Sequence, residues 1–86
     1  MKDMMGNTLA AGDHFVYAAL RYRSVGMRIG RVLEDGRLRI ACEGSVRKED
    51  GTWGRGWELM NGRPNPSQLI KVPVECLSAA AQESLA

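Results

Sequence analysis

Apolar and polar residues alternate along the middle of the chain in segments of strand length. The clearest alternation lies at residues 37–43 and, with the apolar positions that precede it, predicts a β-hairpin over residues 27–43. In the first arm of this hairpin the inward positions change parity between Ile29 and Val32, and Gly30 at the change predicts a bulge. The second arm places Leu38, Ile40 and Cys42 on one face and Arg37, Arg39, Ala41 and Glu43 on the other.

Three further segments have the length and pattern of strands. Residues 14–22 are apolar on both faces, and residues 22–26 are expected to form the loop that leads to the hairpin. Residues 52–60 and 68–72 are the other two predicted strands, separated by a proline-containing loop. Type I′ turns are predicted at three dipeptides that place a glycine second: Asp35-Gly36, Asp50-Gly51 and Asn61-Gly62.

The tail of the chain, residues 74–86, contains no glycine and has apolar residues at helical spacing. A helix this short is marginal in water, so we expect it to pack on another element. Five short strands and a terminal helix predict a mainly β fold, a small five-stranded antiparallel barrel with a short C-terminal helix. The expected core consists of Val16, Ile29, Val32, Leu38, Ile40 and Ile70.

Composition narrows the class of protein. The chain has 86 residues, of which 44% are hydrophobic and 26% charged, and this is typical of one small globular domain. The net charge of +2 does not by itself indicate a nucleic-acid partner. The start of the chain lacks the apolar core of a signal peptide, which favours the cytoplasm. Cys42 and Cys76 are then expected to be two reduced, buried thiols, and a disulfide between them stays open as the alternative.

A resemblance adds to this picture. The strings Gly12-Asp13-x-x-Val16-Tyr17-Ala18, Gly26-x-x-x-Gly30-Arg31-Val32 and Arg37-Leu38-Arg39-Ile40 resemble the opening of SH3-like barrels of the KOW and Tudor kind. With the later string Ile70-Lys71-Val72, the chain looks more closely like small uncharacterised proteins of actinobacterial phages. The resemblance covers residues 12–73 and implies an SH3-like barrel there and a phage origin. We expect the remaining residues to form a flexible segment at 1–11 and the helix at 74–86. The resemblance implies no known activity.

Catalytic and metal chemistry find little support in the sequence. Asp13 and His14 are the one acid–histidine neighbour pair, but adjacent residues of a strand point to opposite faces and do not form an acid–base couple. A structural zinc site has four ligands, and one histidine with two distant cysteines does not form the usual ligand pattern. We therefore expect no enzyme, no metal and no cofactor.

Two groups of residues are candidates for binding. Six arginines and two acids occur between residues 21 and 39, and Arg37 and Arg39, with Arg28 across from them, could form a stripe that contacts phosphate. The alternative for these arginines is a solvated sheet face. The string Trp53-Gly54-Arg55-Gly56-Trp57 places both tryptophans and Arg55 on one face, as a stacking platform or a protein hot spot, or else as part of the core. With Phe15, Tyr17 and Tyr22, the tryptophans could also form an aromatic cage.

The leading hypothesis is a non-enzymatic, phage-type accessory protein that acts as an interaction module for a protein partner, either a host factor or another copy of itself. The alternative is a nucleic-acid-binding barrel. The candidate binding residues are Arg28, Arg37, Arg39, Trp53, Arg55, Trp57 and Tyr22. No membrane is expected, the location is the host cytoplasm if the chain is phage-encoded, and both a monomer and a homo-oligomer stay open.

Overall fold

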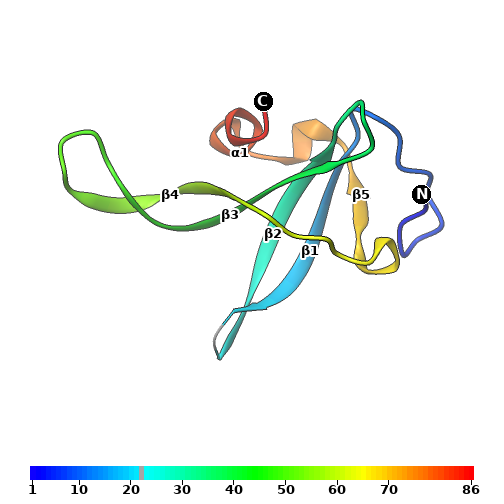
Figure 1. Ribbon diagram of the computed structural model, residues 1–86, viewed down its shortest axis with the longest axis horizontal. Helices are drawn as coiled ribbons and strands as arrows, with labels where there is room; N and C mark the ends of the chain where they lie inside the picture. Colours follow the sequence, from blue (N-terminus) through cyan, green and yellow to red (C-terminus); the bar gives the residue numbers. More distant parts are fainter. Residues whose placement is uncertain (22) are drawn as a thin grey trace.

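The computed structural model describes residues 1–21 and 23–86, and it consists of one antiparallel sheet with a short helix on one face (Figure 1). The strands follow each other across the sheet in the order β4-β3-β2-β1-β5. Their bounds are β1 His14–Arg21, β2 Ser24–Val32, β3 Leu38–Arg47, β4 Trp53–Met60 and β5 Ile70–Val72. Two 3-10 turns, Pro66–Gln68 and Val74–Cys76, flank β5, and the helix α1 spans Ala79–Ser84.

The predicted class is confirmed: the fold is mainly β, with five antiparallel strands and a short C-terminal helix. The sheet is open, because its two edge strands, β4 and β5, are not paired with each other in the described part of the chain. The predicted helix is shorter than expected. Ser78 caps it, its hydroxyl accepting a hydrogen bond from the Ala81 N–H at 3.2 Å, and only six residues of the tail are α-helical.

The main core lies on one face of the sheet. Phe15 and Ile40 are fully buried there, and the N-terminal segment and the residues before β5 cover them with Leu9 and Leu69. Gly30 lies directly opposite Phe15, and a Cβ at Gly30 would stand 2.2 Å from the Cζ of that ring. The glycine therefore makes room for the aromatic ring.

A second, smaller core lies on the opposite face, under α1. Ile29 and Ala41 of the sheet pack there against Ala81 and Leu85 of the helical tail. This second core explains the change of parity in β2, because Ile29 and Val32 are both buried on opposite faces of one regular strand. The predicted bulge at Gly30 is wrong, since the ladder runs through this residue in unbroken register.

The predicted turns fall in the right places at Asp35-Gly36 and Asp50-Gly51 but are of another type. At the second turn the Gly51 N–H donates to the Lys48 carbonyl and the Lys48 N–H to that of Thr52, with Gly51 at φ 86°. This is a three-residue loop closed by a left-handed glycine, in place of the two-residue type I′ turn. Asn61-Gly62 is no hairpin turn, because β4 is followed by a long loop and β5 pairs with β1.

Two expectations about the ends of the chain also change. The segment of residues 1–11, expected to be flexible, is folded against β5: Lys2 and Thr8 form a β-bridge, and Asp3 and Leu9 are buried. Cys42 is buried as expected, whereas Cys76 is exposed, and no disulfide joins them in the described chain.

The six expected core residues are divided by the structure. Ile29, Val32 and Ile40 are buried. Val16 and Leu38 are half-buried at the margins of the two cores. Ile70 is 36% exposed, and it lies on the short strand β5 at the edge of the sheet.

Candidate functional site

The β1–β2 hairpin extends well past its neighbours in the sheet. β5 pairs with β1 only as far as Val16, and β3 pairs with β2 only from Arg28 onward. Residues 17–21 and 24–27 therefore form a two-stranded projection, the β1–β2 arm, which points away from the rest of the fold (Figure 1). The predicted loop at residues 22–26 is thus wrong for Ser24 to Gly26, which belong to β2, while Tyr22 lies outside the described residues.

One face of the β1–β2 arm is apolar and exposed. Leu20 stands directly opposite Val25, and Ala18 directly opposite Met27. The exposed fractions are 71% for Leu20, 68% for Val25 and 56% for Met27. We call these four residues the apolar patch. Sequence reasoning finds one half of it, the apolar face of residues 14–22 that carries Ala18 and Leu20. It misses the other half, because it assigns Val25 to a loop and Met27 to the inward face.

The patch continues toward the second core on the same face of the sheet. Ile29, two positions beyond Met27 in β2, is buried under α1, and Ile70 lies across from Val16. The helix thus covers one end of an apolar surface and leaves the other end open. No acidic residue occurs in the sequence between His14 and Leu33.

A second arm carries the tryptophans. Residues 43–47 of β3 pair only with β4, and this β3–β4 arm points in another direction from the first (Figure 1). Trp53 and Trp57 do share a face, but Trp53 is 70% exposed and Trp57 packs beside α1 in the second core. The Arg55 guanidinium is bound to the Glu43 carboxylate of the neighbouring strand at 2.7 Å. Of the three residues, Trp57 and Arg55 thus contact neighbouring parts of the fold, whereas Trp53 is largely exposed.

The expected arginine stripe is not formed. Arg28 lies opposite Cys42 on the face of the main core, whereas Arg39 lies on the other face, opposite Arg31. Arg37 precedes β3 and contacts Asp35 at 3.4 Å. The side chains of Arg28 and Arg39 therefore project from opposite faces of the sheet. For this reason the three arginines do not contact one flat ligand together.

The expected aromatic cage is not formed either. Phe15 and Tyr17 are buried in the main core, with ring centroids 6.2 Å apart. Their role is packing, and Tyr22 again lies outside the described residues.

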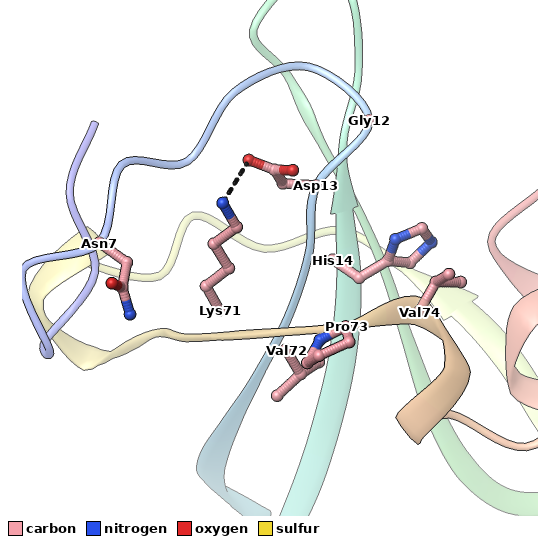
Figure 2. A pocket seen from close by; sticks show the side chains of 8 residues that line it. All are labelled: Asn7, Gly12, Asp13, His14, Lys71, Val72, Pro73 and Val74. Carbon is pink, nitrogen blue, oxygen red and sulfur yellow. Dashed lines mark ion pairs between the residues drawn. The ribbon is translucent and has the colours of Figure 1, made fainter.

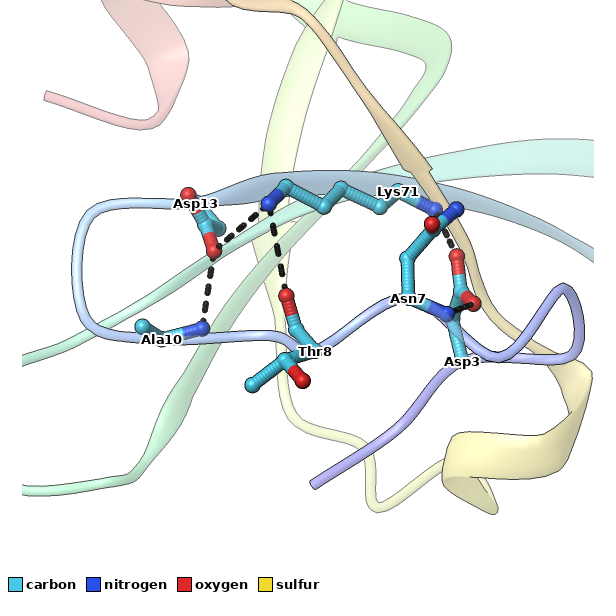
Figure 3. Close-up of polar contacts among 6 residues, drawn as sticks. All are labelled: Asp3, Asn7, Thr8, Ala10, Asp13 and Lys71. Atoms are coloured by element: carbon cyan, nitrogen blue, oxygen red, sulfur yellow. Dashed lines mark hydrogen bonds and ion pairs between the residues drawn. The ribbon is translucent and has the colours of Figure 1, made fainter.

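A pocket of about 550 Å³ lies where the N-terminal segment meets β5 (Figure 2). Within it the Lys71 ammonium contacts the Asp13 carboxylate at 3.4 Å and donates to the Thr8 carbonyl at 3.3 Å, while the Lys71 N–H donates to the Asp3 carboxylate at 2.7 Å (Figure 3). The contacts with Thr8 and Asp3 tie the N-terminal segment to β5, and the contact with Asp13 ties β5 to the residue before β1. We therefore interpret the network as structural.

The ionisable groups of this pocket have shifted pKa values with clear causes. The N–H of Ala10 is the largest cause that lowers the pKa of Asp13, ahead of Lys71, and it outweighs partial burial. The pKa of His14 is lowered by burial first and by the charge of Arg31 second. The imidazole points toward Val74, away from Lys71 (Figure 2). Asp13 and His14 are therefore not an acid–base pair.

Comparison with known families assigns the chain to one of them. A family model described as a domain of unknown function, DUF7205, matches residues 1–72. The chain belongs to the DUF7205 family. The match ends at the last residue of β5, so both arms and the whole sheet lie inside the DUF7205 region and α1 lies beyond it. No curated protein and no solved structure matches the chain.

The described part of the chain shows neither a membrane-spanning helix nor a metal-binding cluster. Over residues 1–21 and 23–86 no helix is long and apolar enough to cross a membrane. The same residues contain no group of three or more histidines, cysteines or acids arranged to hold a metal ion.

Proposed function

We propose that this chain is a non-enzymatic interaction module that binds a protein partner through the apolar patch of the β1–β2 arm. The observation that carries the proposal is the pair of cross-strand contacts, Leu20 with Val25 and Ala18 with Met27, on an arm that no other element covers in the described chain. The partner would be a host factor or another copy of the chain.

The physics of the arm supports a partner. A two-stranded hairpin is marginally stable in water, and it gains stability when a third strand or a packed layer covers it. Monomeric proteins rarely expose contiguous apolar patches larger than roughly 300–600 Å², and patches of that size are often functional. Leu20, Val25 and Met27 are each more than half exposed, and burying such a side chain stabilises an interface by about 1.5–3 kcal/mol.

Nucleic-acid binding through the expected arginine stripe has weaker support. Arg28 and Arg39 lie on opposite faces, and Arg37 is engaged by Asp35. A phosphate backbone requires several cations along one surface.

The test is site-specific photo-crosslinking in cells that produce the full chain. A photoreactive residue in place of Met27 should give a protein adduct, and the same residue in place of the exposed Arg63, which lies on the loop before β5, should not. Adding Leu20→Asp should abolish the Met27 adduct while the fold is kept, because an exposed position changes stability by about 0.5 kcal/mol or less.

The adduct also identifies the partner. A product of twice the 9.5 kDa chain mass indicates a second copy, and any other mass leads by mass spectrometry to a protein that is then purified. That purified protein should bind the native chain and not the Leu20→Asp variant. Equal crosslinking from both sites, an adduct that resists Leu20→Asp, or an adduct with nucleic acid alone would contradict the proposal.

A further inference from the structure

Two arginines and a histidine stand in a row across the sheet, away from the apolar patch. His14 of β1 lies directly opposite Arg31 of β2, and Arg31 lies directly opposite Arg39 of β3. Residues directly opposite each other in an antiparallel ladder share a face, with Cβ atoms roughly 5 Å apart. All three side chains are half-buried, so water screens them less than it screens exposed charges.

This row is unfavourable on its own. Like charges directly opposite each other in a sheet destabilise it. The effect is visible at His14, whose pKa is lowered by the charge of Arg31 in addition to burial. The charge of Asp13, the nearest acid in the sequence, raises the pKa of His14 but only as the smallest of the three effects. The Asp13 carboxylate itself is engaged by Ala10 and Lys71 (Figure 3).

The row also has unused hydrogen-bonding capacity. The Nε of Arg31 is buried and has no hydrogen-bond partner in the described chain. Buried polar groups are nearly always paired, so an orphaned guanidinium nitrogen points to a missing acceptor. One oxygen already reaches the row: the main-chain oxygen of Ala86 accepts a hydrogen bond from Nη1 of Arg39. A guanidinium has five donors, and the Nε of Arg31 is one that no acceptor satisfies in the described part of the chain.

We propose that His14, Arg31 and Arg39 form a binding site for a phosphate group. A tetrahedral phosphate presents oxygens in several directions, which lets one group accept hydrogen bonds from two guanidinium forks and an imidazole at once. Its negative charge offsets the repulsion within the row. The phosphate can be free inorganic phosphate or part of a nucleic-acid backbone, which offer the same chemistry to these three side chains.

The site differs from the arginine stripe expected from the sequence. It shares only Arg39 with that stripe and replaces Arg28 and Arg37 by His14 and Arg31. It is also independent of the proposed protein interface, because Leu20 and Val25 at the far end of the β1–β2 arm take no part in it.

The first experiment titrates the purified full chain with inorganic phosphate at constant ionic strength, with chloride as the reference anion. NMR should show saturable shifts of the His14 ring protons and the Arg31 Nε–H, and Tm should rise with phosphate and not with chloride. Arg31→Gln should weaken phosphate binding by at least about tenfold, as expected for a charge-assisted contact, while Arg63→Gln on an exposed loop should leave it unchanged.

Arg31 is half-buried, so Arg39→Gln provides a second variant, and the native-chain titration decides the question if neither variant folds. No saturable response beyond that to chloride would overturn the proposal. So would a response that both variants retain.

A second experiment separates the two sources of phosphate. A single-stranded oligonucleotide of about 12 nucleotides is compared with its uncharged methylphosphonate analogue and with inorganic phosphate. Tighter binding of the charged oligonucleotide, lost in Arg31→Gln, assigns the site to a nucleic-acid backbone. Binding of inorganic phosphate alone assigns it to the free anion. An oligonucleotide that binds as well to Arg31→Gln, with no phosphate binding, would contradict the site.

Discussion

A single close approach between two residues organises the centre of the sheet. The ring of Phe15 lies over Gly30, where any side chain would overlap its atoms. A glycine in the middle of a strand costs conformational entropy and gives nothing to pack, so its presence needs a reason. Here the reason is packing: the absent side chain makes room for the far end of the fully buried Phe15 ring. The sequence singles out Gly30 but predicts a backbone bulge there. In the structure the strand is regular at Gly30, and the glycine makes room for the ring of Phe15.

Gly30→Ala is therefore expected to destabilise the fold strongly. Overpacked core positions cost about 1–3 kcal/mol, and the ring of Phe15 must also shift to admit the methyl group. Gly26→Ala in the same strand is the matched control, because nothing lies within 4 Å of its Cβ position, and it should change stability by about 0.5 kcal/mol or less. Urea unfolding of the two variants measures the difference. Equal midpoints would show that Phe15 does not rest on Gly30.

The strands show which buried positions the local alternation of apolar and polar residues predicts and which it does not. The second arm of the predicted hairpin alternates cleanly, and Ile40 on its inner face is fully buried as expected. Ile70 has the same side chain and was expected in the core as well, but it lies on the three-residue edge strand β5 and is exposed. Burial depends on which elements cover a residue. The strand that pairs with β5 is β1, more than fifty positions earlier in the chain, so the local pattern around Ile70 does not indicate whether it is buried.

The helix α1 is the element most dependent on such packing. Six residues do not form a stable helix in water, so α1 exists because Leu85 and Ala81 are buried against the sheet. Trp57 packs beside them, which makes its fluorescence a measure of whether the helix is seated.

Leu85→Ala should unseat the helix and lower the free energy of unfolding by about 2–5 kcal/mol, because Leu85 is fully buried. In a Trp53→Phe background, which removes the exposed tryptophan, the emission of Trp57 should shift to longer wavelength. Glu83→Ala changes an exposed residue of the same helix and should leave the spectrum unchanged. An unshifted spectrum for Leu85→Ala would mean that the helix does not hold Trp57.

At the scale of the whole molecule, the N-terminal segment closes the fold from the far end of the sequence. Asp3 is buried, and its carboxylate accepts hydrogen bonds from the N–H groups of Lys71, Asn7 and Met5 at 2.7, 2.8 and 3.0 Å. No periodicity signals this closure, because it rests on one acid at position 3 and one backbone amide sixty-eight positions later. The expectation of a flexible segment at residues 1–11 is wrong for this reason.

The same closure makes the molecule sensitive to acid. The Lys71 N–H, ahead of the other donors, holds the pKa of Asp3 below its usual value of 3.8 against the opposing effect of desolvation. A carboxyl whose pKa is lower in the folded state contributes stability above the usual value, and this contribution is lost as pH falls through the folded pKa. We therefore expect the free energy of unfolding to drop as the pH falls from about 4 toward 2.

Asp3→Asn should be less stable than the native chain at pH 7 and lose less stability on further acidification. Glu75→Gln, which removes one exposed negative charge, should follow the native curve. Denaturant titrations at a series of pH values measure this. Parallel curves for the native chain and Asp3→Asn would show that the N-terminal segment is held by something other than this carboxylate.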